Sequence, residues 1–134
     1  MSAIRAGETL ARLRPDEGSA ALLAQALIRA QQYARAATTL EPFATKPDTK
    51  ATTLYLLGVS HTQTKNYPKA ILALERAAAK SPADVNIYRM LGYDYEVSKQ
   101  YAKALNAYER GLQLVPNDPE LKESAERVRP FAKT

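Results

Sequence analysis

The sequence lacks cysteine altogether and contains a single histidine, His61. The absence of cysteine excludes disulfide bridges, thiolate metal sites and a cysteine nucleophile, and it suits an oxidising or a reducing compartment equally. One histidine cannot supply a histidine-rich metal cage or a proton relay. We therefore expect no metal site and no cofactor.

Glycine is also scarce, with five residues in 134. Without a glycine-rich segment there is no phosphate-binding loop, Walker segment or Gly-x-Ser-x-Gly elbow. The carboxylates Asp94 and Glu96 are two residues apart on a predicted helix, so they point in different directions and make a poor acid–base pair. The sequence therefore predicts no catalytic residues, no enzymatic activity and no small-molecule substrate.

Long hydrophobic runs are missing as well. The longest one, Ala20–Ile28, is interrupted by Gln25, whereas a helix that spans a membrane needs roughly 20 apolar residues. Met1–Arg14 carries four charged residues and no apolar core of a signal peptide. We expect no membrane span. The default location is cytoplasmic, unless a longer protein carries an export signal outside this segment.

What the chain does contain is an ordinary globular composition and an internal repeat. Apolar residues make up 46% and charged residues 25%, as in a soluble single domain. Several residue types return at a period of 34, which is a sign of a repeat architecture. The repeating rows are Tyr33, Tyr67 and Tyr101, then Ala36, Ala70 and Ala104, then Leu23-Ala24, Leu57-Gly58 and Leu91-Gly92, with Pro82 and Pro116 closing two units.

Each unit is predicted to be a pair of helices. In the third unit, apolar residues follow helical spacing from Tyr88 to Tyr95 and again from Ala104 to Leu112, with a turn at Gln100-Tyr101 between them. Asp84 and Asp118 stand where helix N-caps are expected.

Prolines and small residues add detail to this pattern. Pro68 fits the first turn of a helix, whereas Pro42 falls inside one and should kink or shorten it. Small residues such as Gly92 and Gly111 should let neighbouring helix axes approach closely.

These rows resemble the tetratricopeptide repeat family, whose pattern in each repeat is a large residue, Leu-Gly, Tyr, Ala, an aromatic residue, Ala and Pro. The resemblance implies an all-α fold, an α-α superhelix in which antiparallel helix pairs stack as a right-handed solenoid. It also places His61 at the family's packing tyrosine, between helices. The expected single domain, 1–134, divides into an N-terminal helix (1–16), repeat 1 (17–50), repeat 2 (51–84), repeat 3 (85–118) and a C-terminal capping helix (119–134).

The two ends of the chain differ in character. Residues 1–15 align with Ala104–Pro116, so they resemble the second helix of a unit whose first helix is missing. We expect this chain to be cut from a longer array; the alternative is a natural N-terminal capping helix. Pro119–Val128 has one apolar stripe and a polar outer face, as terminal repeats need.

The family's binding surface is the concave face of such a stack, lined by the first helices. Carried over by position, it would be formed by Gln25, Arg29, Tyr55, Val59, Thr62, Gln63, Asn86, Arg89, Tyr93 and Glu96, flanked by Gly18, Ala21, Ile28, Thr52 and Val97 and completed by Glu120, Glu123 and Arg127.

This set suits a peptide ligand. Asn and Gln can bond both donors and acceptors of an extended backbone. Arg29 and Arg89 could pair with a carboxylate, and Tyr55 and Tyr93 offer the aromatic area typical of binding hot spots. The resemblance therefore implies a non-enzymatic scaffold that binds a peptide or helix of another protein. One specialised mode is excluded, because the carboxylate clamp that some members use is replaced here by Ala21, Gln25, Leu56, Asn86 and Met90.

Two other functions stay open. The chain carries a net charge of +5, and Arg35, Lys69 and Lys103 recur at the same period beside Lys65 and Lys99. Such a row could meet nucleic acid phosphates or anionic lipid, but few aromatic residues lie among the cations, so we do not expect nucleic acid as the partner. The repeats could also be a structural spacer or a self-assembly segment of a longer array.

Overall fold

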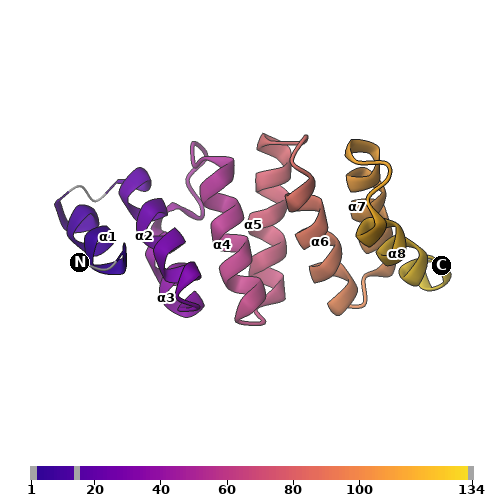
Figure 1. Ribbon diagram of the computed structural model, residues 1–134, viewed down its shortest axis with the longest axis horizontal. Coiled ribbons are helices and arrows are strands. Elements are labelled where there is room, and N and C mark those ends of the chain that lie inside the picture. Colours follow the sequence, from indigo (N-terminus) through magenta and orange to yellow (C-terminus); the bar gives the residue numbers. More distant parts are fainter. Residues whose placement is uncertain (1–2, 14–15, 133–134) are drawn as a thin grey trace. The chain divides into compact units, whose positions relative to one another are not determined.

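The computed structural model describes residues 3–13 and 16–132, and within this part of the chain it contains helices and no strand (Figure 1). This confirms an all-α helical repeat solenoid. The helices are α1 (Ala3–Leu13), α2 (Glu17–Arg29), α3 (Tyr33–Leu40), α4 (Ala51–Gln63), α5 (Tyr67–Lys80), α6 (Val85–Val97), α7 (Tyr101–Leu114) and α8 (Pro119–Val128), with short 3₁₀ turns at Glu41–Phe43 and Arg129–Phe131.

The chain forms two compact units, residues 1–73 and 74–134, which are described separately below. The helix starts follow the period of the sequence in both. The first residues of α2, α4, α6 and α8 are each one period apart, and α3, α5 and α7 each begin at a tyrosine of the repeating row. The period seen in the sequence is therefore the period of the helix pairs.

The turns inside the helix pairs share one backbone conformation. Gln31, Lys65 and Lys99 have φ angles of 60°, 63° and 62°, in the left-handed region that usually favours glycine. At the second of these turns the Asn66 amide donates to the His61 carbonyl at 2.8 Å, and the Lys65 amide donates to the Thr62 carbonyl at 3.0 Å. The same pair of hydrogen bonds closes the other two turns, so all three are Schellman caps formed without glycine.

Helix ends lie where the sequence predicts them. The side chains of Asp84 and Asp118 accept hydrogen bonds from the Asn86 and Leu121 amides, each at 3.0 Å. Pro42 does shorten its helix: α3 ends at Leu40 and continues as a 3₁₀ turn, because proline cannot donate the next helical hydrogen bond.

The first unit has an aliphatic core. α1 packs on α2, α2 on α3, and both α2 and α3 on α4. Leu23, Leu27, Leu40 and Leu57 are buried together with a group of alanines. His61 is also buried in this unit, and its Nε2 lies 2.9 Å from the Glu41 carboxylate.

The second unit buries tyrosines as well as aliphatic residues such as Ile87, Leu91 and Leu121. Tyr88, Tyr95 and Tyr108 are all buried, and the Tyr88 hydroxyl donates to the Pro82 carbonyl at 2.9 Å. Gly92 lies directly against the Tyr108 ring. The small residue therefore makes room for an aromatic side chain of the neighbouring helix.

Candidate protein-interaction site

All ten predicted contact residues lie on first helices of the repeats, six in the first unit and four in the second. Most of them reach the surface. The exposed ones are Arg29, Gln63, Asn86 and Tyr93, and the half-buried ones are Gln25, Tyr55, Val59, Arg89 and Glu96. Thr62 differs, because only 6% of it is exposed. This burial is at odds with the expectation that its side chain contacts a partner, since the last turn of α4 faces the interior at that position.

In the second unit, three of these residues meet α8. Arg89, Tyr93 and the Glu96 carboxylate stand on α6, and α8 lies beside them. A groove of about 370 Å³ separates the two helices; its lining residues are Arg89, Tyr93, Tyr108, Glu120, Leu121, Glu123, Ser124 and Arg127. Tyr108 and Leu121 are buried and form the floor, while Tyr93 is 48% exposed at the edge. We call this the α6–α8 groove.

The groove continues into a shallower hollow at the start of both helices. This hollow has a volume of about 670 Å³ and shares Arg89, Glu120 and Glu123 with the groove. Asn86, Asp118 and Pro119 complete its lining. The two hollows share three lining residues and together form a strip along α6 and α8.

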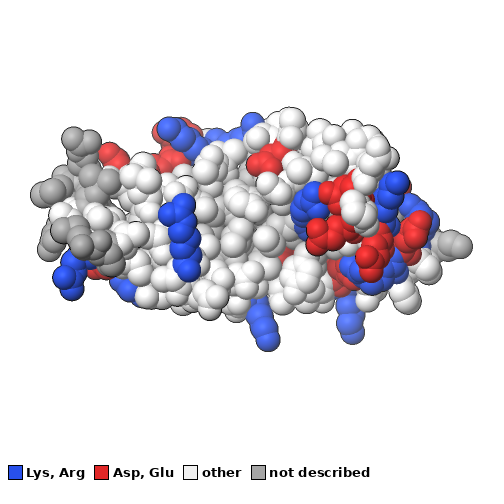
Figure 2. Space-filling view, viewed as in Figure 1, with Lys and Arg blue, Asp and Glu red and all other residues white. Residues whose placement is uncertain are grey.

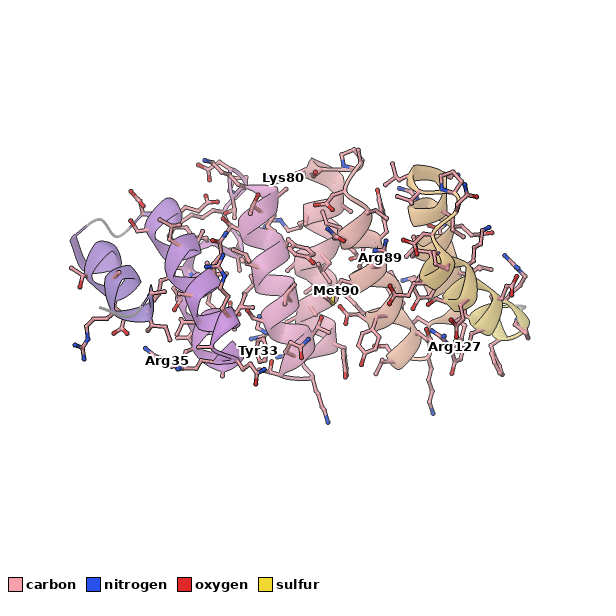
Figure 3. The ribbon with its side chains drawn as sticks, viewed as in Figure 1. Tyr33, Arg35, Lys80, Arg89, Met90 and Arg127 are labelled. Carbon is pink, nitrogen blue, oxygen red and sulfur yellow. The ribbon has the colours of Figure 1, made fainter. Side chains whose placement is uncertain are left out.

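Arg89 holds the start of this strip. Its guanidinium donates to the Asp118 carboxylate, and its Nη1 lies 3.4 Å from the Glu120 carboxylate (Figure 3). The hydrogen bond from Arg89 and the amide of Leu121 hold the pKa of Asp118 below its usual value. The bond to Asp118 likewise raises the pKa of Arg89.

Arg127 holds the other end (Figure 3). Its Nε and Nη2 donate to the two oxygens of Glu96 at 2.8 and 3.0 Å, the bidentate geometry that favours Arg–carboxylate pairs. The buried Tyr108 hydroxyl donates to the same carboxylate at 2.8 Å. The bond from Arg127 lowers the pKa of Glu96. Burial raises the pKa of Tyr108, and the hydrogen bond to Glu96 raises it further.

The sequence predicted most residues of this candidate site but not which of them form ion pairs. It placed Arg89 and Glu96 on the binding face and offered Glu120, Glu123 and Arg127 from the last helix, but gave no role there to Tyr108 or Asp118. The spacing in the sequence could have indicated this pair. Arg89 and Asp118 are 29 residues apart, which is close to the length of one repeat, and residues one repeat apart lie on neighbouring first helices.

The first unit joins its first helices differently. One oxygen of Glu17, at the start of α2, accepts from the Lys50 amide at 2.9 Å and from the Thr53 hydroxyl at 2.6 Å. This carboxylate thereby caps the N-terminus of α4, where the helix dipole favours a negative charge. Tyr55 and Val59 lie further along α4 and are half-buried.

The repeating cations are partly engaged within their own units. The Arg35 guanidinium donates to Gln32 at 2.5 Å and lies 3.4 Å from the Glu8 carboxylate. The Lys103 amine lies 5.9 Å from the centre of the Tyr95 ring. Two cations of the repeating row, Arg35 and Lys103, therefore contact groups of their own unit.

Residues 3–13 and 16–132 offer no group of three or more His, Asp or Glu side chains that could hold a metal ion. In the same part of the chain, no helix combines the length and the apolar character that a bilayer crossing requires.

Comparisons with known proteins agree with the fold. A family model described as "Anaphase-promoting complex, cyclosome, subunit 3" matches residues 1–77, and one described as "Tetratricopeptide repeat" matches residues 85–118. No curated protein matches the sequence.

Among solved structures, the chain is similar to two crystal structures of MamA, with TM-scores of 0.88 and 0.86 and 24% identity in both cases. The matches cover 96% of this chain and 70% and 80% of those chains. A third, MamA 41-end from Desulfovibrio magneticus RS-1, has a TM-score of 0.80 and 23% identity over 96% of this chain and 78% of its own.

At these identities the likeness concerns the fold, and the family follows from the two family models. Their matches lie on the helix pairs whose starts recur at the period of the sequence. The chain therefore belongs to the tetratricopeptide repeat family, whose members are typically non-enzymatic scaffolds for protein–protein interaction.

Proposed function

We propose that this chain is a non-enzymatic scaffold that binds an extended segment or a helix of a partner protein on the first helices of its repeats. The main contact site is the α6–α8 groove. The observation that carries the proposal is the groove itself: about 370 Å³ of open volume over a buried floor, beside the exposed Tyr93.

The walls of the groove support a binding role because they are held in place before any partner arrives. The Arg89 contacts to Asp118 and Glu120 and the bidentate Arg127–Glu96 pair fix α8 against α6 at two points. A surface that is already ordered loses little conformational entropy when it binds. Preorganisation of this kind favours recognition of a flexible peptide.

Tyr93 supports the same site from the rim. Its ring is 48% exposed although tyrosine offers a large apolar area, and such residues dominate interface energies when a partner covers them. Val97 follows one turn later on α6 and is 41% exposed. A partner side chain in the groove would shield the Tyr93 ring from water.

The test is selection of peptides from a display library of random sequence against the immobilised chain, followed by affinity measurements with variants. Tyr93→Ala should weaken the selected peptides by about tenfold, as expected when an interface aromatic is truncated. Leu114→Ala is the matched control, because Leu114 is a similarly exposed apolar residue of the second unit that does not line the groove.

The outcome decides between the groove and other surfaces. Affinity that falls with Tyr93→Ala and persists with Leu114→Ala supports the groove. Equal affinity of both variants and the unaltered chain would place the binding elsewhere and contradict the proposal. Melting curves of the two variants show whether a loss reflects misfolding.

A further inference from the structure

The charge of the α6–α8 groove differs from that of the whole chain. The chain has a net charge of +5. The groove and its adjoining hollow, in contrast, contain two cations, Arg89 and Arg127, and three carboxylates, Asp118, Glu120 and Glu123. The Glu96 carboxylate bonded to Arg127 is a fourth, so the local balance is −2. Figure 2 shows acidic atoms gathered in the part of the second unit where α8 lies, with basic atoms among and around them.

Both cations of the groove are already engaged. Arg89 directs its two terminal nitrogens at Asp118 and Glu120, and Arg127 makes two hydrogen bonds to Glu96. A carboxylate from a partner protein would have to displace the carboxylates already bonded to these arginines, and it would enter among four negative charges. Arg89 is therefore unsuited to the role that the sequence suggested for it, which was to pair with a partner carboxylate.

Two of the carboxylates remain open to a ligand. The Glu120 side chain is 86% exposed and lies 3.4 Å from Arg89 at the edge of the site. Glu123 is exposed and lines both hollows. Glu123 stands one helical turn beyond Glu120, so the two carboxylates are neighbours on one face of α8.

We infer that the partner segment is basic: a stretch with lysine or arginine that pairs with Glu120 and Glu123 and places a cation or its aliphatic stem near Tyr93. This inference rests on the proposed function and names the chemistry of its ligand. An aromatic ring beside a carboxylate pair suits a lysine or arginine in particular, because the ring face attracts cations. The net positive charge of the whole chain opposes diffuse binding of such a segment, so the local excess of carboxylates favours this groove as its site.

The experiment uses two fluorescein-labelled twelve-residue peptides in which one tyrosine lies among glycine and serine. One peptide carries four lysines, and four glutamates replace them in the other. Fluorescence anisotropy at low ionic strength should show binding of the lysine peptide only. Its affinity should fall as salt is added, because exposed charge pairs are screened.

A matched pair of charge reversals locates the site. Glu123→Lys and Glu126→Lys change the net charge equally on the same helix, but only Glu123 lines the groove. The first should weaken the lysine peptide by about tenfold, since reversal changes the energy of a close pair by twice its Coulomb term. The second should change the affinity by less than about twofold.

Each other outcome overturns the inference in a recognisable way. Equal losses from both reversals would mean diffuse attraction without a site. Preferred binding of the glutamate peptide would reverse the assigned chemistry. A mass that rises with concentration in light scattering, and that Glu123→Lys abolishes, would make the occupant a second copy of the chain.

The proposed function fails separately. One outcome is that neutral peptides from the display selection depend on Tyr93, while the lysine and glutamate peptides bind equally to the unaltered chain and to both charge reversals. In that case the groove binds peptides, but the inference of a basic partner is wrong. If no peptide of any charge depends on Tyr93, the groove itself is wrong.

Discussion

The two units connect neighbouring first helices by different means. In the first, the single carboxylate of Glu17 caps the start of α4 and bonds to Thr53. In the second, Arg89 and Arg127 hold α8 against α6 through side chains that reach across from both ends of a groove. The first connection caps the start of a helix, and the second forms the walls of the candidate site.

The contrast extends to the cores. Leucine and alanine fill the first unit, whereas the second buries three tyrosines among its aliphatic residues, and each tyrosine hydroxyl donates to a polar partner. Tyr108 is the clearest case, because its ring lies on Gly92 while its hydroxyl bonds to Glu96. The same repeat frame therefore accommodates two kinds of interior, and the second couples the core to the groove.

The largest expected effect comes from removing a core leucine in either unit. Leu91→Ala in the second unit and Leu57→Ala in the first each delete a buried side chain and should lower the free energy of unfolding by ~2–5 kcal/mol. Hydrogen exchange should show the loss mainly in the unit that carries the change, since repeats depend on nearest neighbours. A thermal melt identical to that of the unaltered chain would contradict this.

Two glycine substitutions, one in each unit, should change the free energy of unfolding in opposite directions. In Gly92→Ala the new methyl would lie 2.7 Å from Cζ of Tyr108 and closer to two other ring atoms, and the overpacking should cost roughly 1–3 kcal/mol. In Gly18→Ala the methyl meets only Asp16, at 3.6 Å. The better helix propensity of alanine should then stabilise α2 by up to about 1 kcal/mol. Urea unfolding measures both, and destabilisation by Gly18→Ala would contradict the account of the first unit.

Acid should weaken the ion pairs that connect α6 and α8 in the second unit. The pKa values of Glu96 and Asp118 are lower in the folded chain than in the unfolded one. Their stabilisation is therefore complete above the unfolded values and is lost as the pH falls through the folded ones, below about 4. Glu96→Gln should cost about 0.5–1 kcal/mol at pH 7, and urea titrations should show the difference shrinking at pH 3. A difference that is the same at both pH values would show that the carboxylate charge contributes nothing.

The smallest effect should be the same in both units. Lys65 and Lys99 adopt the left-handed backbone conformation, with φ near 60°. This conformation is costly for a residue with a Cβ atom. Lys65→Gly and Lys99→Gly should each stabilise the chain by up to about 1 kcal/mol, measured by thermal melting. Lys65→Ala and Lys99→Ala remove the same charge but keep the Cβ, so they should not stabilise it.

The parts that the sequence predicted well are those set by local interactions. The N-caps at Asp84 and Asp118 and the end of α3 before Pro42 depend on residues within one or two turns. The repeat period then extended these local rules over the chain. Helix starts could therefore be read from the sequence alone.

The groove was less predictable because its contacts cross from one repeat to the next. The sequence placed Arg89 on the predicted binding face, but its pairing with Asp118 depends on how α6 and α8 pack, which no local pattern specifies. The same holds for Tyr108 on Gly92 and for the burial of Thr62. Position within a repeat placed nine of the ten predicted contact residues at least partly at the surface, and packing decides what each one bonds to.

The most direct test of the α6–α8 groove is NMR mapping of a bound peptide from the display selection. Backbone amide shifts of the isotope-labelled chain would be followed as the peptide is added. We predict that the largest shifts lie on α6 and α8, at Tyr93, Glu120, Glu123 and Ser124, with small changes in α1–α3. Shifts concentrated on α7 or on the first unit, with α6 and α8 unchanged, would contradict the central claim.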